Sequence, residues 1–244
     1  LRPRSGPCLP ARRPLKFETN ISILGRSSCL WEMAFNKKKL KFVAPCILAL
    51  STLFLTGAVA RSEGARETIV FVRHGEKPDA GLGQLNCQGL NRALALPAVV
   101  SNLFGKPDAI FAPNPAVQKT DDGKAYDYVR PLATIEPTAI AFGLPVNTSF
   151  GLSDTSGLRA ALEKKRSAHR SGFVLVAWEH KIIVTLAKAL LAHHGGDPAA
   201  VPKWHGDDFD SIYVIVLTAA YGTVTATFEH KQENLNGLPQ TCPR

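Results

Sequence analysis

Short apolar runs alternate along this chain with segments in which apolar residues recur at helical spacing. The runs are rich in β-branched residues, as is typical of buried strands, and they predict strands at 68–72, 109–112, 173–177, 211–217 and 223–228. The segments with helical spacing predict helices at 87–103, 130–142, 153–166 and 182–191. Pro97 and Pro137 lie inside the first two helices and are expected to kink or break them.

This alternation also predicts the fold class. Strands that alternate with helices form parallel sheets, because each helix returns the chain to the same edge. We therefore expect an α/β protein, a three-layer αβα sandwich with a mainly parallel central sheet in one domain. Residues 223–228 follow a turn and are expected to pair antiparallel with the strand before them, as an edge strand. The polar segment 116–128 is expected to be a surface loop.

The first 60 residues follow a different pattern. Met33, the only methionine, precedes a basic segment at 36–41, an apolar run at 42–55 and Ala-Val-Ala at 58–60. That order is typical of a secretory signal peptide, and the apolar run is shorter than the ~20 residues of a membrane span. We expect residues 1–32 to be an untranslated or disordered upstream segment and 33–60 a signal peptide. Residues 61–244 are then the mature domain, which is periplasmic or secreted. The alternative is an uncleaved membrane anchor.

The net charge of +9 resides mainly in this leader. Residues 61–244 hold 19 basic and 18 acidic residues, a net charge of +1, so nothing favours a nucleic-acid partner, or a membrane partner after cleavage. Cys87 and Cys242 fit either one disulfide of an exported protein or two unpaired thiols. No cofactor or metal motif is present. His193 and His194 are expected to end a helix, because no third ligand is spaced to complete a metal site.

Two predicted strands end in residues that carry chemistry. The strand at 68–72 leads into Arg73, His74 and Gly75, and the strand at 173–177 leads to Glu179 and His180. The carboxyl ends of neighbouring parallel strands lie at one sheet edge, where α/β proteins bind ligands. Arg130, at the start of a helix, is expected to join them. Two guanidiniums and two imidazoles predict an anion pocket, with phosphate as its usual occupant.

Residues 72–78, with the sequence VRHGEKP, resemble the opening motif of the histidine phosphatase superfamily, which has the phosphoglycerate-mutase-like fold. Residues 85–93, the region of Arg130 and the strand-end His180 are similar to later stretches of that family, so the resemblance covers about 67–217. It implies an exported bacterial-type phosphomonoesterase in which His74 forms a phosphohistidine intermediate. Arg73, Arg130 and His180 would hold the non-bridging oxygens.

An alkoxide leaving group also needs a general acid. Members of the family commonly have a carboxylic acid either directly after the second histidine, where this chain has Lys181, or in the segment after the second arginine. Glu179 and Asp154 are the alternatives, with Glu179 preferred; if neither serves, we expect substrates with good leaving groups. Two other functions stay open, a catalytically inactive phosphate- or anion-binding module of the same fold and a phosphoglycerate-mutase-like phosphoryl transferase. The expected partner is a small phosphorylated substrate, whose identity the sequence does not specify, and the oligomeric state is open.

Overall fold

The computed structural model describes residues 65–168 and 171–244. The upstream segment and the signal peptide predicted at 1–32 and 33–60 lie outside the described residues. Within the described ranges, no helix is both long and apolar enough to cross a membrane.

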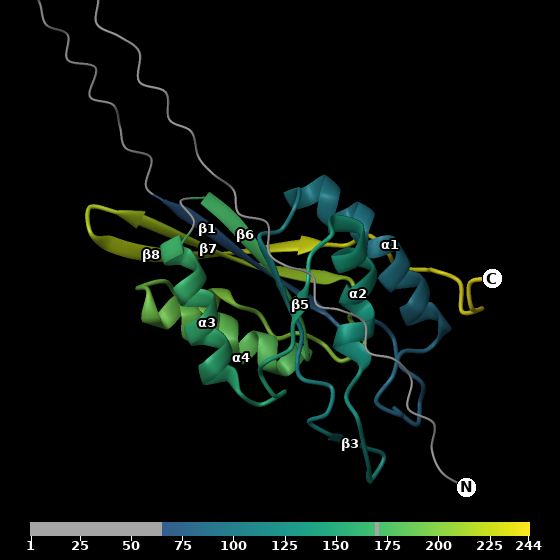
Figure 1. Ribbon diagram of the computed structural model, residues 1–244. Coiled ribbons are helices and arrows are strands. Elements are labelled where there is room, and N and C mark those ends of the chain that lie inside the picture. The colour runs from purple at the N-terminus through teal and green to yellow at the C-terminus, as the bar shows by residue number, and fades with distance from the viewer. Residues whose placement is uncertain (1–64, 169–170) are drawn as a thin grey trace, which may run out of the picture. The chain divides into compact units, whose positions relative to one another are not determined.

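A six-stranded mixed sheet forms the centre of the domain (Figure 1). Its strands, in spatial order, are β5 (Val146–Asn147), β2 (Ala109–Phe111), β6 (Ser171–Trp178), β1 (Arg66–Arg73), β7 (Ser211–Ala220) and β8 (Thr223–Gln232). The first four run parallel, and β7 and β8 add antiparallel pairs at one side. The prediction of a mainly parallel sheet with an antiparallel edge strand is confirmed by this order. The antiparallel pairing of β7 with β1, next to the parallel pairs, was not predicted.

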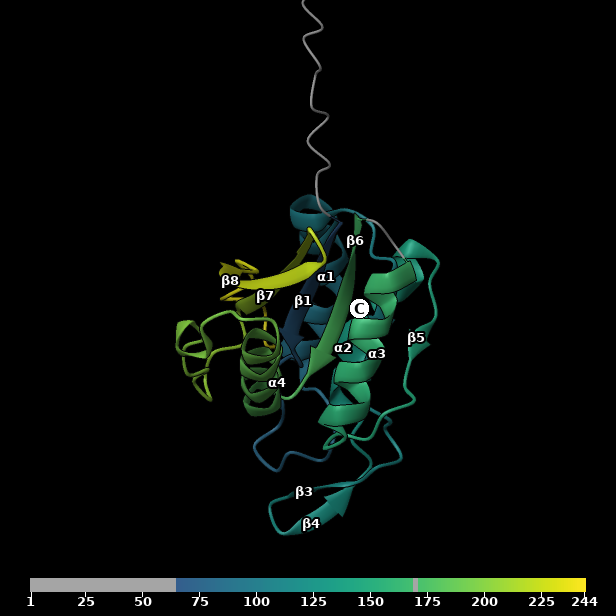
Figure 2. The ribbon, with the colours of Figure 1, turned by 90° about the vertical axis from the view of Figure 1, so that its left-hand side faces the viewer.

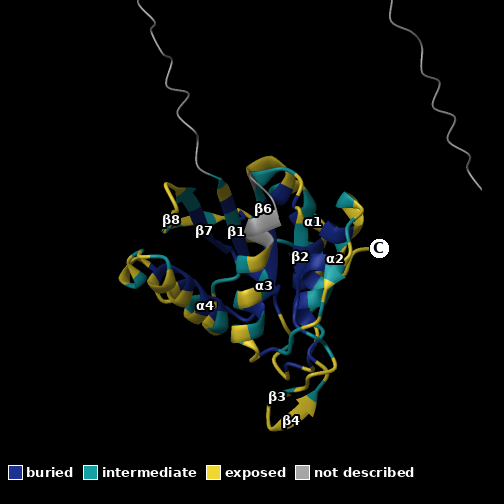
Figure 3. Cartoon of the chain, turned by 60° about the vertical axis from the view of Figure 1, so that its left-hand side comes forward, coloured by how far each residue is buried: buried dark blue, intermediate teal, exposed yellow. Residues whose placement is uncertain are grey.

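Helices cover both faces of the sheet, which confirms the three-layer sandwich. Helices α1 (Cys87–Phe104) and α2 (Arg130–Phe142) lie on one face, and α3 (Thr155–Ala168) and α4 (His180–His193) lie on the other (Figure 2). Strand β1 shows why both faces are apolar. Ile69 and Phe71 pack with α3 and α4, whereas Val70 and Val72 pack with α1 and α2, so the strand is buried on both sides. Figure 3 shows the buried sheet between helices whose outer sides are exposed.

Two features of the chain refine the predictions. Pro97 and Pro137 lie inside α1 and α2 and do not break them, since each helix continues through its proline as one element. The predicted surface loop at 116–128 contains a two-stranded hairpin, β3 (Lys119–Asp121) and β4 (Lys124–Tyr126). This hairpin projects beyond the carboxyl ends of β1 and β6 (Figure 2), so it lies on the side of the sheet where the candidate site is expected.

The carboxyl-terminal tail is attached to the start of α1. Cys87 and Cys242 form a disulfide with an S–S distance of 2.04 Å. The Asn91 side-chain amide donates to the carbonyls of Pro239 and Thr241. Of the two possibilities that the sequence left open for these cysteines, the structure shows the disulfide.

Candidate active site

The carboxyl ends of β1 and β6 bring the two predicted sequence motifs together. The parallel register pairs Arg73 with Trp178, and the His74 N–H donates to the Trp178 carbonyl at 3.1 Å. His74 therefore follows β1 at the level where Glu179 and His180 follow β6. Gly75 is required at this point, because a Cβ there would lie 2.9 Å from the Gly89 carbonyl oxygen of α1. The predicted adjacency of the two histidine-bearing strand ends is confirmed.

His74 is held in one tautomer. Its side chain is buried, with 3% of the residue exposed, and Nδ1 lies 2.8 Å from the Gly75 carbonyl oxygen. A carbonyl only accepts hydrogen bonds, so Nδ1 carries the proton and Nε2 keeps its lone pair. Gly75 is in turn fixed, because its N–H donates to the Thr134 hydroxyl on α2. The ring thus presents a nucleophilic nitrogen in a defined direction.

The electrostatic environment keeps this imidazole neutral. Burial is the main cause that lowers the pKa of His74, and the charges of Arg130, Arg73 and Lys119 lower it too. Together they bring the pKa to about 3, against the raising effect of the bond to Gly75. Three cations acting on one buried histidine therefore define a positively charged site around a neutral ring.

The Arg73 guanidinium holds the loop that precedes β7. Its terminal nitrogens donate to the carbonyls of His205, Gly206 and Asp208, at 3.3, 2.8 and 2.5 Å. The guanidinium also stacks on Phe209 at 3.9 Å, and the Phe209 ring lies 6.1 Å from that of His74. Arg73 Nε is buried and has no hydrogen-bond partner among the residues that the structure describes. The Nε–H donor is therefore left for a ligand.

Arg130, the first residue of α2, is already paired within the chain. Its fork binds the carboxylate of Asp121 from the hairpin, at 2.5 and 3.3 Å, and it also donates to the Gly81 carbonyl. Asp121 accepts a further bond from the Gly83 N–H. A bidentate carboxylate thus occupies the positions on Arg130 that a phosphate would take, while Arg130 Nε is buried and has no partner in the described ranges.

The hairpin and the residues after it bring two further side chains to the site. Tyr128 is fully buried, with its ring edge-on to His74 at 6.1 Å and 4.8 Å from the Arg130 guanidinium. Lys119 Nζ lies 5.1 Å from the Tyr128 ring centroid. Burial raises the pKa of Tyr128 although the adjacent Arg130 guanidinium lowers it, so the hydroxyl stays protonated, and within the described part of the chain no acceptor takes the proton of this buried hydroxyl. Tyr128 is thus a third donor without a partner beside His74.

Glu179 does not fit the general-acid role that the sequence analysis preferred. Its carboxylate caps α4 by accepting from the N–H groups of Lys181 and Ile182, and Oε1 lies 2.9 Å from His180 Nδ1. Burial opposes its ionisation, but His180, the Ile182 N–H and Lys119 together lower its pKa to about 2. Glu179 is therefore a carboxylate at neutral pH and has no proton to give. Glu179 instead acts as an anionic partner for His180 and the nearby cations.

Asp154, the other candidate acid, is exposed and caps α3. Its carboxylate accepts from the Gly157 N–H and the Ser156 hydroxyl, and its backbone carbonyl accepts from Leu158. No contact that the structure records for Asp154 involves the residues around His74. The structure therefore assigns Asp154 a local capping role.

The sequence analysis did not find Asp121, Lys119 or Tyr128. All three lie in or next to the segment predicted to be a surface loop, where alternating polar residues and Asp-Asp-Gly match an exposed turn. A possible signal was the hairpin itself, since Asp122-Gly123 is a favoured two-residue turn between short extended segments. That signal predicts a hairpin but not the fact that it faces the active site.

Comparisons with known proteins give structural matches only. No protein-family model matches the chain, and no curated protein matches it. Phosphoglycerate mutase from Plasmodium falciparum is similar at 14% identity and a TM-score of 0.48, over 74% of this chain and 98% of that one. The putative phosphohistidine phosphatase SixA from Nakamurella multipartitia is similar at 15% identity and a TM-score of 0.45, over 68% and 96%. A phosphoserine phosphatase mutant from Entamoeba histolytica is similar at 12% identity and a TM-score of 0.40, over 70% of this chain and 98% of that one.

Proposed function

We propose that the chain is a phosphohydrolase of the histidine phosphatase type that works through a phosphohistidine on His74. The observation that carries this proposal is the cluster of buried, unpartnered donors beside a neutral imidazole. Arg73 Nε, Arg130 Nε and the Tyr128 hydroxyl are buried, and none of them has a hydrogen-bond partner within residues 65–168 and 171–244. Buried polar groups are almost always satisfied, so three orphan donors at one site indicate a missing acceptor. An anion rich in oxygen atoms, such as a phosphoryl group, fits that requirement.

The reaction has two displacement steps at phosphorus. The His74 Nε2 lone pair forms an N–P bond while the P–O bond to the leaving group breaks with its electron pair. Water then forms a new P–O bond as the N–P bond breaks, which returns neutral His74 and releases inorganic phosphate. The charge on the non-bridging oxygens is spread over the donors of Arg73, Arg130 and Tyr128, which the fold already holds in place.

The leaving group has to depart without a carboxylic acid to protonate it. Glu179 is ionised, and Arg130 holds the pKa of the Asp121 carboxyl below its usual range. We therefore infer that the substrates have leaving groups that are stable as anions or already protonated, such as aryl phosphates, phosphoanhydrides or phosphohistidine. Alkyl phosphates, whose alkoxide needs a proton in the transition state, are expected to react far more slowly.

The test is turnover of p-nitrophenyl phosphate together with trapping of the intermediate. We expect hydrolysis by the wild type, a phosphoenzyme that is labile to acid and stable to base, and loss of both in His74→Ala. His193→Ala removes an exposed histidine at the far end of α4 and is the matched control. The ratio of kcat/KM for p-nitrophenyl phosphate to that for glycerol phosphate tests the leaving-group requirement.

The other outcomes separate the rival functions. Binding of inorganic phosphate without turnover would overturn the enzyme proposal in favour of an inactive binding module, for which the occupied Arg130 fork is a specific argument. Transfer of the phosphoryl group to a second phosphorylated acceptor faster than to water would favour a mutase.

We also propose that the mature domain is exported after cleavage at Ala60. The disulfide between Cys87 and Cys242 supports this proposal, since such bonds form and persist in oxidising compartments. Amino-terminal sequencing of the protein from the cell exterior or periplasm should give Arg61 as the first residue. A protein that retains residues 33–60 would contradict cleavage.

A further inference from the structure

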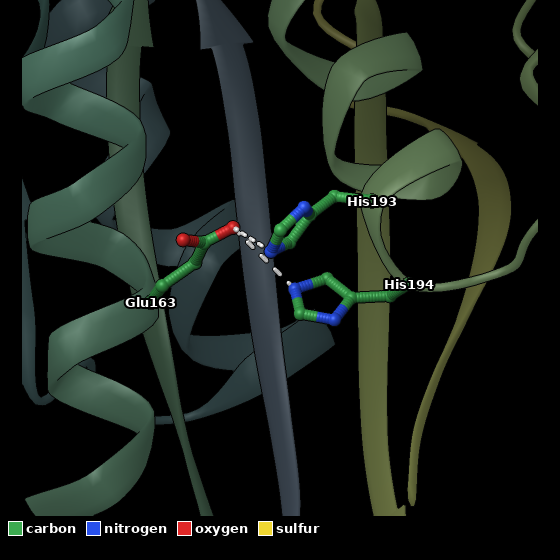
Figure 4. Close-up of side chains that lie close together, drawn as sticks. All are labelled: Glu163, His193 and His194. Carbon is green, nitrogen blue, oxygen red and sulfur yellow. Dashed lines mark ion pairs between the residues drawn. The ribbon is translucent and has the colours of Figure 1, made fainter.

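Two histidines at the end of α4 meet a glutamate from α3 on a surface away from the candidate active site. His193 is the last residue of α4, and His194 is its cap residue. Glu163 Oε1 lies 3.8 Å from His193 Nε2 and 3.5 Å from His194 Nε2. Figure 4 shows both imidazole rings directed toward this carboxylate. The third ligand that the sequence spacing did not supply therefore comes from the neighbouring helix.

The separations of these atoms fit a small metal ion. One ligand atom from each residue lies within 4.8 Å of the other two. Zn²⁺ binds imidazole nitrogen at about 2.0–2.1 Å in a tetrahedron, which places ligand atoms ~3.4 Å apart. The two distances to Glu163 are within a few tenths of an ångström of that value. The His193 side chain is 54% exposed, so a rotation of this ring can close the remaining separation.

The kinds of ligand select the class of metal. Two imidazole nitrogens and one carboxylate oxygen, completed by a water molecule, form a known zinc-binding set, and imidazole favours Zn²⁺ and its neighbours over Ca²⁺ or Mg²⁺, which prefer all-oxygen sites. A water molecule is the natural fourth ligand, because His193 faces solvent.

Among the side chains that the structure describes, Arg159 competes with a metal ion for the Glu163 carboxylate. Arg159 lies one turn before Glu163 on α3, with a terminal nitrogen 3.4 Å from the same Oε1. This contact is longer than the usual 2.7–2.9 Å of a charge-assisted hydrogen bond, and the Arg159 side chain is 34% exposed. The guanidinium can move into solvent at little cost when a metal ion takes its place.

We propose that Glu163, His193 and His194 form a binding site for Zn²⁺ or a similar divalent transition-metal ion, which links α3 to α4. The 14 residues of α4 span about 20 Å, and His180 lies at the opposite end of that helix. The ion therefore stabilises the packing of the two helices and takes no part in the chemistry at His74. This proposal does not depend on the proposed phosphatase activity.

The test uses the full chain, without an affinity tag and freed of metal, with Zn²⁺ as the probe. We expect Zn²⁺ at 100 times its Kd to raise Tm by about 5–10 °C. Co²⁺ should give the visible absorption bands of a tetrahedral site. Both effects should be lost in His193→Ala and in Glu163→Gln, which keeps the shape of the side chain. Lys188→Ala, an exposed change on the same helix, is the control and should keep both effects.

Arg159→Gln distinguishes a metal site from a simple ion pair. If Glu163 exists to bind metal, removal of the competing guanidinium should tighten Zn²⁺ binding several-fold. If Glu163 only pairs with Arg159, this variant should lose stability and gain nothing from Zn²⁺. A wild type that shows no Zn²⁺-dependent rise in Tm, or a rise that His193→Ala and Glu163→Gln both retain, would overturn the proposal. Hydrolysis of p-nitrophenyl phosphate should be the same in Glu163→Gln and wild type.

Discussion

The state of a single imidazole, His74, determines whether the site can act as a nucleophile at ordinary pH. A free histidine is half protonated near pH 6.5, and a protonated ring has no lone pair to offer. Burial and the surrounding cations lower the pKa of His74 to about 3, so the ring is neutral and ready to attack over the whole physiological range. The same shift destabilises the fold in acid, because the unfolded chain takes up this proton from about pH 6.5 downward.

The pH profile of kcat/KM tests this state, since it reports groups of the free enzyme. We expect no loss of activity through His74 between pH 8 and pH 5, after correction for ionisation of the aryl phosphate, because that loss comes only as the pH falls through about 3. His180→Asn serves as the control for the second histidine. An acid limb centred near pH 6.5 that persists in His180→Asn would show that His74 titrates normally.

At the scale of elements, the β3–β4 hairpin controls access to Arg130. The hairpin places Asp121 on the Arg130 fork, and Gly81 makes the approach possible, since a Cβ there would lie 2.5 Å from the Asp121 side chain. A phosphoryl group that uses the whole fork has to displace this carboxylate. Only molecules in which Asp121 has left Arg130 can then bind the phosphoryl group with the whole fork. The apparent substrate affinity is the intrinsic affinity multiplied by the fraction of such molecules.

Asp121→Asn should therefore improve substrate binding. The amide keeps the shape of the side chain and removes the charge that competes with phosphate, so we expect KM for p-nitrophenyl phosphate and the inhibition constant for inorganic phosphate to fall about tenfold. Asp122→Asn, at the adjacent exposed turn position, is the matched control. If kcat falls in Asp121→Asn while KM stays constant, Asp121 positions Arg130 and does not block it.

The tertiary contacts of the hairpin could not be predicted from the sequence, whereas the strands that carry the two histidines could. The strands β1 and β6 were predictable because a continuous apolar run is typical of a strand that is buried on both faces. The positions of His74 and His180 at one sheet edge could be predicted because each histidine follows the end of such a run. Asp121 is polar and sits in a turn, and its burial against Arg130 depends on a tertiary contact that no local pattern encodes. Glu163 was missed as a partner of His193 for the same reason. Glu76 and Asp210 are likewise polar residues outside helices and strands, and their burial around Arg92 depends on tertiary contacts.

At the scale of the whole molecule, the disulfide joins the carboxyl-terminal tail to the first helix. The residues after β8 are attached to α1 through Cys242 and the Asn91 side chain, and the bond closes a loop of 155 residues. Replacement of both cysteines by serine should lower the free energy of unfolding by about 2–5 kcal/mol, since a long loop in the unfolded chain regains its freedom. Urea unfolding measures this change. A loss below 1 kcal/mol would mean that only the tail is released.

A buried charge network around Arg92 joins α1, the end of β1, the loop before β7 and the end of β8. Arg92 is 1% exposed and contacts the carboxylates of Glu76, Asp210 and Glu233 at 2.8, 3.3 and 2.7 Å. One guanidinium cannot balance three carboxylates in a buried site. Burial raises the pKa of Glu233 to about 8, against the effect of Arg92 and with the help of Asp210 and Glu76. Glu233 is thus the carboxyl that retains a proton.

This raised pKa makes the stability of the fold depend on pH. Between about pH 4.5, where the unfolded glutamate titrates, and about pH 8, the folded state binds the extra proton, so stability falls as pH rises. Glu233→Gln cannot ionise and keeps an oxygen for Arg92. As the pH rises from 5 to 8, the free energy of unfolding of Glu233→Gln minus that of the wild type should increase by up to about 1.4 kcal/mol per pH unit. Urea unfolding at each pH measures this difference. Glu229→Gln, an exposed change on β8, which ends just before Glu233, controls for the loss of one charge. Parallel curves for Glu233→Gln and wild type would show that Glu233 is already ionised in the folded protein and that the network holds all three carboxylates charged.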